Sequence, residues 1–183
     1  MEQYTGHEQA DDNLEIRVDD HVTLRLITQG AASEVYRLIR DNLSYLEPWV
    51  GWATEAFDEA ANRRFIQDNI DAYHEGTAYA MGVYDDGALQ GVVDIRNLDT
   101  PKATPEVGYW LAEKAQGKGL ATRSVQALID FSRAHHDINT IVLHTLPGNE
   151  ASGRVAERLG FMYEGEVTDE NGVREERYSL TEK

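Results

Sequence analysis

A glycine-rich turn, Gln116–Ala121, is the feature of this sequence that most restricts the fold. It follows a strand-like run, Glu106–Leu111, and opens a long helical pattern from about Leu120 to His136. Glycines let the backbone approach a ligand closely because they carry no Cβ atom. The helix N-terminus behind them offers unpaired N–H groups and a partial positive charge. This arrangement predicts a seat for a phosphate or pyrophosphate.

The remaining elements surround this turn in an order typical of an α/β fold. The order is β, α, α, three strands, α, β, α and a final hairpin, with no evident domain boundary. Hydrophobic periodicity and turn residues define these elements. The predicted strands are Val22–Ile27, Thr77–Tyr84, Ala88–Asn97, Glu106–Leu111, Thr140–Leu146, Phe161–Val167 and Arg174–Leu180, and the predicted helices are Ala31–Asn42, Asp58–His74, Leu120–His136 and one that starts at Asn149 and stops at Gly160.

Composition narrows the class of protein further. With 183 residues, the chain is long enough for one domain with a sizeable core. It carries 17 lysines and arginines against 33 aspartates and glutamates, a net charge of −16. This balance argues against general nucleic-acid binding, which needs a basic face, and favours a cationic partner such as an amine. Few of the basic residues are lysines, which suggests a high-salt host.

The termini and the cysteine count set the expected compartment. Residues 1–13 are poor in apolar side chains and are predicted to form a flexible tail, which leaves residues 14–183 as a single domain. The polar N-terminus argues against a signal peptide, and no run approaches the roughly 18 apolar residues of a membrane span. The chain has no cysteine, and its six histidines lack metal-ligand spacing. We therefore expect a cytoplasmic protein without membrane association or a metal.

Several phosphate binders compete for the glycine turn. A Walker loop needs G-x-x-x-x-G-K-[ST], which the chain lacks. A dinucleotide fold needs G-x-G-x-x-G, but Thr122 occupies the third glycine position. On spacing alone, a structural turn without a ligand stays open.

A second motif completes the pattern. Gln116-x-x-Gly119-x-Ala121 resembles the Q/R-x-x-G-x-G/A signature of the GNAT superfamily of N-acetyltransferases, and Asn149–Phe161 resembles the second motif of that family. Gly108–Leu111, Ser152 and Leu46–Trp52 are similar to the RimJ/RimL branch. The resemblance covers about residues 22–180. It implies a GNAT fold: a mixed, mostly antiparallel sheet with helices on both faces.

The resemblance also implies an acetyl-CoA site. In the family, backbone N–H groups of the glycine turn hold the pyrophosphate, and the pantetheine arm pairs with the preceding strand. The arm lies where two strands splay apart, here those of Tyr109 and Val142, with Gly108 near the splay unless it marks a bulge. The implied cofactor-binding residues are Trp110, Leu111, Ala112, Gln116, Gly117, Lys118, Gly119, Leu120, Ala121, Thr122, Asn149 and Ser152.

The implied chemistry is direct attack of an amine on the thioester. Glu106 falls where several family members carry a general base, and partial burial would raise its pKa toward neutrality. Other members use ordered water, and a solvated carboxylate is the alternative for Glu106. A backbone N–H near Leu111 would stabilise the oxyanion. Many members protonate the thiolate with a tyrosine, but Ala156 occupies that position, and Ser152 matches the serine that the RimJ/RimL branch uses.

The acceptor amine is less constrained. Trp49 and Trp52 would lie in a loop that borders the acceptor site, although core packing is expected for one of them. Tyr178 on the last strand is a third candidate for substrate contact. The resemblance implies a protein N-terminal α-amine of the ribosomal-protein type as acceptor. A small amine (polyamine, amino acid or antibiotic), a non-catalytic CoA-binding sensor and a homodimer stay open.

Overall fold

The structure, a computed structural model that describes residues 11–100 and 103–182, is built on one eight-stranded sheet. The strand order is β1-β2-β3-β4-β5-β6-β8-β7, and only β5 and β6 run parallel. The predicted mixed, mostly antiparallel sheet is thus confirmed. The strands are β1 (Glu15–Arg17), β2 (Val22–Leu26), β3 (Tyr79–Asp85), β4 (Ala88–Arg96), β5 (Glu106–Leu111), β6 (Thr140–Thr145), β7 (Met162–Thr168) and β8 (Arg174–Thr181).

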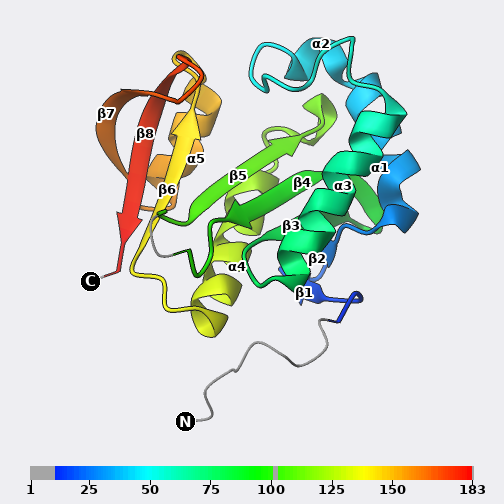
Figure 1. Ribbon diagram of the computed structural model, residues 1–183, viewed down its shortest axis with the longest axis horizontal. Coiled ribbons are helices and arrows are strands. Elements are labelled where there is room, and N and C mark those ends of the chain that lie inside the picture. The colour runs from blue at the N-terminus through cyan, green and yellow to red at the C-terminus, as the bar shows by residue number, and fades with distance from the viewer. Residues whose placement is uncertain (1–10, 101–102, 183) are drawn as a thin grey trace.

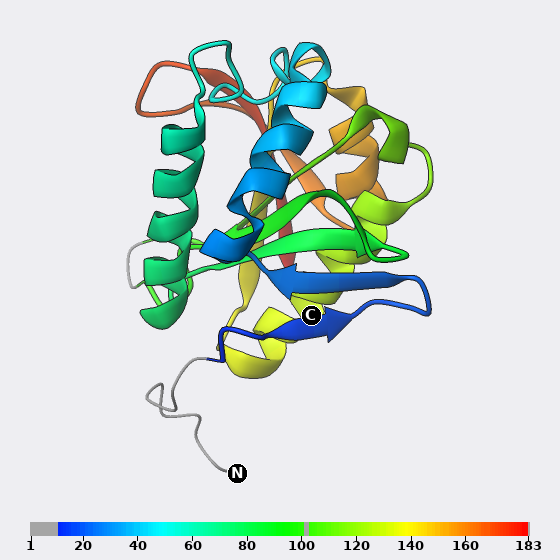
Figure 2. The ribbon, with the colours of Figure 1, turned by 90° about the vertical axis from the view of Figure 1, so that its right-hand side faces the viewer.

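Helices cover both faces of the sheet, as predicted. Figure 1 shows α1 and α3 in front of it and α4 behind, and Figure 2 shows the same layers from the β1 edge. The helices are α1 (Ala32–Asp41), α2 (Leu43–Leu46), α3 (Glu59–His74), α4 (Leu120–His135) and α5 (Glu150–Arg158), and short 3₁₀ turns occupy Gln29–Ala31 and Glu113–Ala115. Over the described ranges, no helix combines the length and the apolar character that a membrane crossing needs.

Strand alternation divides the core into two clusters. Val93 and Ile95 of β4 pack with the buried face of α4, whereas Val92 of the same strand packs with α1 and α3. Successive side chains of a strand point to opposite faces, so one strand contributes side chains to both clusters. Full burial of each such side chain stabilises the fold by about 1.5–3 kcal/mol.

Two helix starts carry the caps that the sequence predicts. The Asp58 carboxylate accepts a hydrogen bond from the amide of Ala61 at 2.7 Å and begins α3. The side chain of Asn149 accepts one from the amide of Ser152 at 3.2 Å and begins α5. Asp and Asn are favoured at this position because their oxygens satisfy helix amides that lack a partner.

Part of the predicted N-terminal tail contacts α3. The hydroxyl of Tyr73 donates to the Asp11 carbonyl and His74 pairs with Asp12. The short strand β1 follows directly and pairs with β2, although its three residues gave no strand signal of their own. Residues 1–10, the rest of the predicted tail, lie outside the described part of the chain.

A bulge shapes the sheet next to β5, but not at Gly108. The pairing of β4 with β5 runs without a shift through Gly108, whereas Gln90 of β4 is an extra residue opposite β3. The carbonyl of Gln90 accepts the amide of Ala112 at 2.8 Å and so fixes the end of β5. A Cβ atom on the adjacent Gly91 would lie 2.1 Å from the carbonyl oxygen of Trp110. Glycine is required here by the close approach of two backbones.

We therefore expect Gly91→Ala to lower the free energy of unfolding by about 1–3 kcal/mol, the usual cost of forcing extra volume into a packed site. Urea unfolding followed by circular dichroism measures the change. Gly51→Ala is the matched control, because a Cβ atom there meets nothing within 4 Å. Equal unfolding midpoints for the two variants would contradict the steric account.

Candidate active site

The parallel strands β5 and β6 touch at one point and then diverge, as Figure 1 shows. Glu106 and Val142 are the paired residues, and the amide of Val142 donates to the Pro105 carbonyl at 2.9 Å. The amide of Ala112 points the other way, toward β4. Because backbone groups alternate along a strand, the amide of Leu111 faces the gap. The predicted splay is confirmed, and this amide is placed to meet a ligand inside it.

The turn Gln116–Ala121 has the backbone conformation that a phosphate seat needs. Gly117 and Gly119 have φ values of +75° and +71°, a left-handed region that glycine adopts without strain. A Cβ atom on either residue would meet nothing within 4 Å, so open space lies beside the turn. Helix α4 begins after Gly119 without a side-chain cap. Its first amides are therefore available to an anion.

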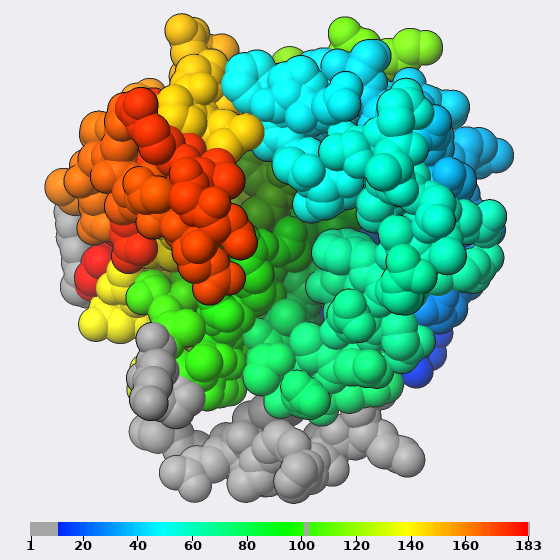
Figure 3. Space-filling view, turned by 45° about the horizontal axis from the view of Figure 1, so that its top comes forward, coloured from blue at the N-terminus to red at the C-terminus, as the bar shows by residue number. Residues whose placement is uncertain are grey.

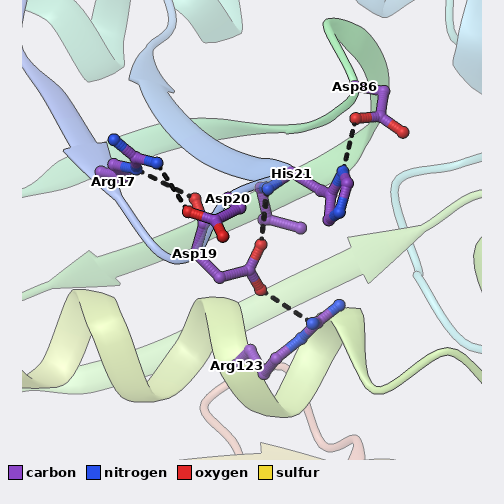
Figure 4. Close-up of polar contacts among 7 residues, drawn as sticks. Arg17, Asp19, Asp20, His21, Asp86 and Arg123 are labelled. Atoms are coloured by element: carbon purple, nitrogen blue, oxygen red, sulfur yellow. Dashed lines mark hydrogen bonds and ion pairs between the residues drawn. The ribbon is translucent and has the colours of Figure 1, made fainter.

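A depression of about 560 Å³ lies over this turn and collects three arginines. They are Arg123 from α4 and Arg154 and Arg158 from α5. Figure 4 shows Arg123 held by Asp19, with an ion-pair distance of 2.8 Å. Guanidinium groups beside an uncapped helix end suit phosphate oxygens. The depression is also lined by Leu111, Ala115, Gln116, Gly117, Gly119, Leu120, Ala121, Thr122, Ala151 and Val155.

A second depression of about 360 Å³, the cleft, continues from the first. Figure 3 shows the hollow between the α2 region, in cyan, and the β7–β8 hairpin, in orange to red, with green residues at its floor. The two depressions form one channel because they share Leu111, Gln116, Ala121, Ala151 and Val155. The other residues of the cleft are Tyr45, Leu46, Trp49, Val50, Gly51, Tyr109, Trp110, His144, Thr145, Leu146, Asn149, Ser152, Asp169, Val173 and Glu175.

Ser152 lines the cleft, and its neighbour Ala151 lines both depressions. The Tyr109 hydroxyl donates a hydrogen bond to Ser152 Oγ at 3.0 Å, across the gap between β5 and α5. Burial raises the pKa of Tyr109, although the hydrogen bond to Ser152 lowers it in part. The tyrosine therefore stays protonated and remains a donor. The hydrogen of Ser152 is left to donate to another acceptor in the cleft, such as a sulfur atom.

Comparison with known proteins identifies this arrangement. The family model described as an acetyltransferase (GNAT) domain matches residues 21–162. The chain is 31% identical to YdaF of Bacillus subtilis (strain 168) over 154 residues, 84% of each protein.

The chain belongs to the GNAT acetyltransferase family.

Two further relatives are informative. The ribosomal-protein-serine acetyltransferase of Escherichia coli (strain K12) is 28% identical over 150 residues, which cover 82% of this chain and 84% of that protein. A solved structure of RimL, a ribosomal L7/L12 α-N-protein acetyltransferase in complex with coenzyme A, superposes with a TM-score of 0.84 at 25% identity. That match covers 92% of this chain and 98% of RimL. This GNAT protein is an acyltransferase, and acetyl-CoA is its acetyl donor.

Most of the predicted CoA contacts line the channel, with two differences. Ala112 lines neither depression, and its amide is bound to Gln90. Lys118 is exposed and does not line either depression, whereas its neighbours Gly117 and Gly119 do. The arginines that line the phosphate end were not predicted, because α4 and α5 are about thirty residues apart in sequence and meet only in the fold.

Glu106 does not reach the cleft, and its pKa moves opposite to the expectation. Burial alone would raise the pKa, but a hydrogen bond from His144 and the charge of Arg96 outweigh it and lower the pKa. Arg96 Nη2 lies 2.6 Å from Glu106 Oε1, and His144 Nδ1 lies 3.1 Å from the same oxygen. The expected shift toward neutrality is therefore wrong. An ionised carboxylate in an ion pair is a weak proton acceptor at neutral pH.

The three predicted acceptor contacts separate in the structure. Trp49 lines the cleft and is 39% exposed. Trp52 does not line it and packs against Trp110, with ring centroids 6.3 Å apart. Tyr178 is only 7% exposed and packs against α5. A Cβ atom on Gly153 of α5 would lie 2.9 Å from the Tyr178 hydroxyl oxygen. Tyr178 is therefore placed in the core instead of the cleft, because its position on β8 points it toward α5.

Gly119→Asp is expected to weaken CoA binding at least about 100-fold, or about 2.7 kcal/mol, because it puts a negative charge in the phosphate seat. Isothermal titration with CoA measures the affinity. Gly87→Asp is the matched control, since Gly87 also has a positive φ and open space but lies in the distant β3–β4 turn. Equal affinities for both variants would place the pyrophosphate elsewhere.

If the Ser152 hydroxyl serves the leaving thiolate, Ser152→Ala is expected to lower kcat at least about tenfold while changing the CoA dissociation constant about twofold or less. Tyr109→Phe should give a smaller loss of the same kind, since it removes only the hydrogen bond that orients Ser152. Steady-state kinetics and CoA titration separate the two effects. Parallel losses in kcat and CoA affinity would make Ser152 a binding residue only.

Proposed function

We propose that this protein transfers the acetyl group of acetyl-CoA to the α-amine of a protein N-terminus, by direct attack of the amine on the thioester. One observation carries the proposal: a single channel joins the glycine turn Gln116–Ala121 to the cleft, and Ser152 lines that cleft next to Ala151, which lines both depressions. An acetyl-CoA molecule with its pyrophosphate at the glycine turn would extend its thioester toward Ser152. An amine would then reach the thioester from the opposite end of the cleft.

The mouth of the cleft supports a peptide acceptor. Trp49 on the α2 side and Val173 on the β7–β8 hairpin are exposed apolar residues that line the cleft. Asp169 and Glu175 line it on the hairpin side, and burial raises the pKa of Glu175. Carboxylates attract the α-ammonium group, and exposed apolar walls suit the first side chains of an extended segment. The named activities of the E. coli relative and of RimL point to a ribosomal protein as acceptor.

The proposal also includes compartment and assembly. Ribosomal acceptors would place the enzyme in the cytoplasm. A homodimer is a further expectation from the resemblance to the RimJ/RimL branch, and light scattering across a dilution series measures it directly.

A panel of acceptors tests the function. Peptides with free N-terminal serine, alanine or methionine should be acetylated with a kcat/KM at least about tenfold above that of spermidine or free amino acids, a difference of about 1.4 kcal/mol in transition-state binding. Thiol release reports turnover, and mass spectrometry of the peptide locates the acetyl group on the α-amine. Faster turnover of spermidine than of every peptide would favour the small-amine function instead. Tight CoA binding without turnover of any amine would favour the sensor.

Trp49→Ala should raise the KM for the best peptide while leaving CoA affinity unchanged, because the indole faces only the acceptor end of the cleft. Phe65→Ala is the control, since Phe65 is an aromatic of similar exposure that does not line the cleft. An equal rise in KM for both variants would remove Trp49 from the acceptor site.

A further inference from the structure

His144 stands between Glu106 and the cleft. Its ring lines the cleft and is 15% exposed, whereas Glu106 does not line the cleft. On β6, Ile141 and Leu143 pack into the α4 cluster, so His144 points to the other face of the sheet. Glu106 shares that face, because its neighbour Val107 also packs into the α4 cluster.

The Glu106 carboxylate fixes the state of the His144 ring. It lies 3.1 Å from Nδ1, a distance that favours the tautomer with hydrogen on Nδ1. Nε2 then carries the free lone pair, and no hydrogen bond to Nε2 is found among residues 11–100 and 103–182. Arg96 binds both Glu106 and Asp94, so a chain of charged groups holds the carboxylate in place. A histidine oriented by a carboxylate is the arrangement of a general base.

We propose that His144 is the catalytic base of this enzyme and that Glu106 is its positioning residue. This inference rests on the acetyl transfer proposed above. Nε2 of His144 takes one proton from the acceptor ammonium, and the freed lone pair attacks the thioester carbon. The C–S bond of the tetrahedral intermediate then breaks. The second proton of the nitrogen passes to the sulfur, through Ser152, and the imidazolium returns its proton to solvent.

The two ends of this reaction lie on opposite faces of the sheet at the β5–β6 gap. Tyr109 and Ser152 meet on the α5 side, where the channel carries CoA. Glu106 and His144 lie on the side of α1 and α3, and Figure 1 shows no helix in front of β6 there. Ser152 and His144 nevertheless line the same cleft, so a thioester in the gap would lie within reach of both faces. The sheet thus separates the group that receives the amine proton from the group that serves the sulfur.

Other charged groups surround the ring and belong to the electrostatic setting of the base. Arg177 of β8 is the strand partner of His144. Glu175 of β8 and Glu164 of β7 both interact electrostatically with His144, and Glu164 is itself held by Arg177 at 2.8 Å.

His144→Asn tests the assignment, because the Asn amide can keep a donor toward Glu106 while Nε2 is lost. We expect kcat/KM for an acceptor peptide to fall at least about 100-fold, the usual contribution of a general base. The acetyl-CoA dissociation constant should stay within about twofold. His21→Asn is the matched control, because His21 forms a 2.8 Å pair with Asp86 outside the cleft, shown in Figure 4.

Two further readouts separate a base from a structural residue. An acceptor amine with a conjugate-acid pKa below about 6 is already neutral at pH 7, so His144→Asn should cost it less than about tenfold. Added imidazole should restore part of the activity of this variant with the peptide. Equal losses on both amines, without rescue by imidazole, would overturn the proposal.

A double-mutant cycle tests the positioning role of Glu106. Glu106→Gln should lower kcat/KM in the wild-type background and have little further effect in His144→Asn, because both changes remove one function. Full additivity would contradict the pairing. If the wild-type enzyme acetylates spermidine but no peptide, the N-terminal acceptor is wrong, and the same variants measured with spermidine still decide the role of His144.

Discussion

The separation of β5 from β6 is the constraint on which the rest of the structure depends. Two parallel strands that stay paired would close the sheet, yet here only Glu106 and Val142 pair before the strands diverge. The backbone of Tyr109 and Leu111 then faces a gap instead of a neighbouring strand. The bulge at Gln90 and the close approach of Gly91 fix the end of β5 from its other side. A rigid strand with one unpaired edge would give the pantetheine arm of acetyl-CoA, as proposed, a place to bind.

Charge is distributed unevenly in this acidic protein, and the distribution follows the channel. Arginines gather beside the uncapped N-terminus of α4, where they would offset the charge of cofactor phosphates bound at the glycine turn. Carboxylates gather at the acceptor end, where an ammonium group would enter. The overall net charge of −16 therefore hides a local cluster of three arginines, two of which are paired with Asp19 and Glu150. The two ends of the channel therefore differ in the charge of the side chains that line them.

Local sequence signals predicted most of the fold. Caps, turn glycines and hydrophobic periodicity are read over a few residues, so α1, α3, α4, α5 and seven of the strands were found near their observed bounds, whereas the four-residue helix α2 was not predicted. The strand β1 was missed because three residues are too few for a periodic signal, and it exists only because β2 offers it an edge. Among site residues, the glycine turn, Asn149 and Ser152 were predicted from motifs of contiguous sequence.

The sequence by itself determined the order of elements, the glycine turn before α4 and the membership of a CoA-dependent family, because each rests on residues close together in the chain. Only the tertiary structure decided which side chains face the cleft. The pairing of the strands, and the face on which each side chain lies, put His144 in the cleft and Tyr178 in the core. Glu106 lies behind His144, outside the cleft. The tertiary structure also brought the Tyr109 hydroxyl into hydrogen-bond contact with Ser152, 43 residues away in sequence. These outcomes depend on strand pairing across long separations, and a shift of one residue would reverse every face.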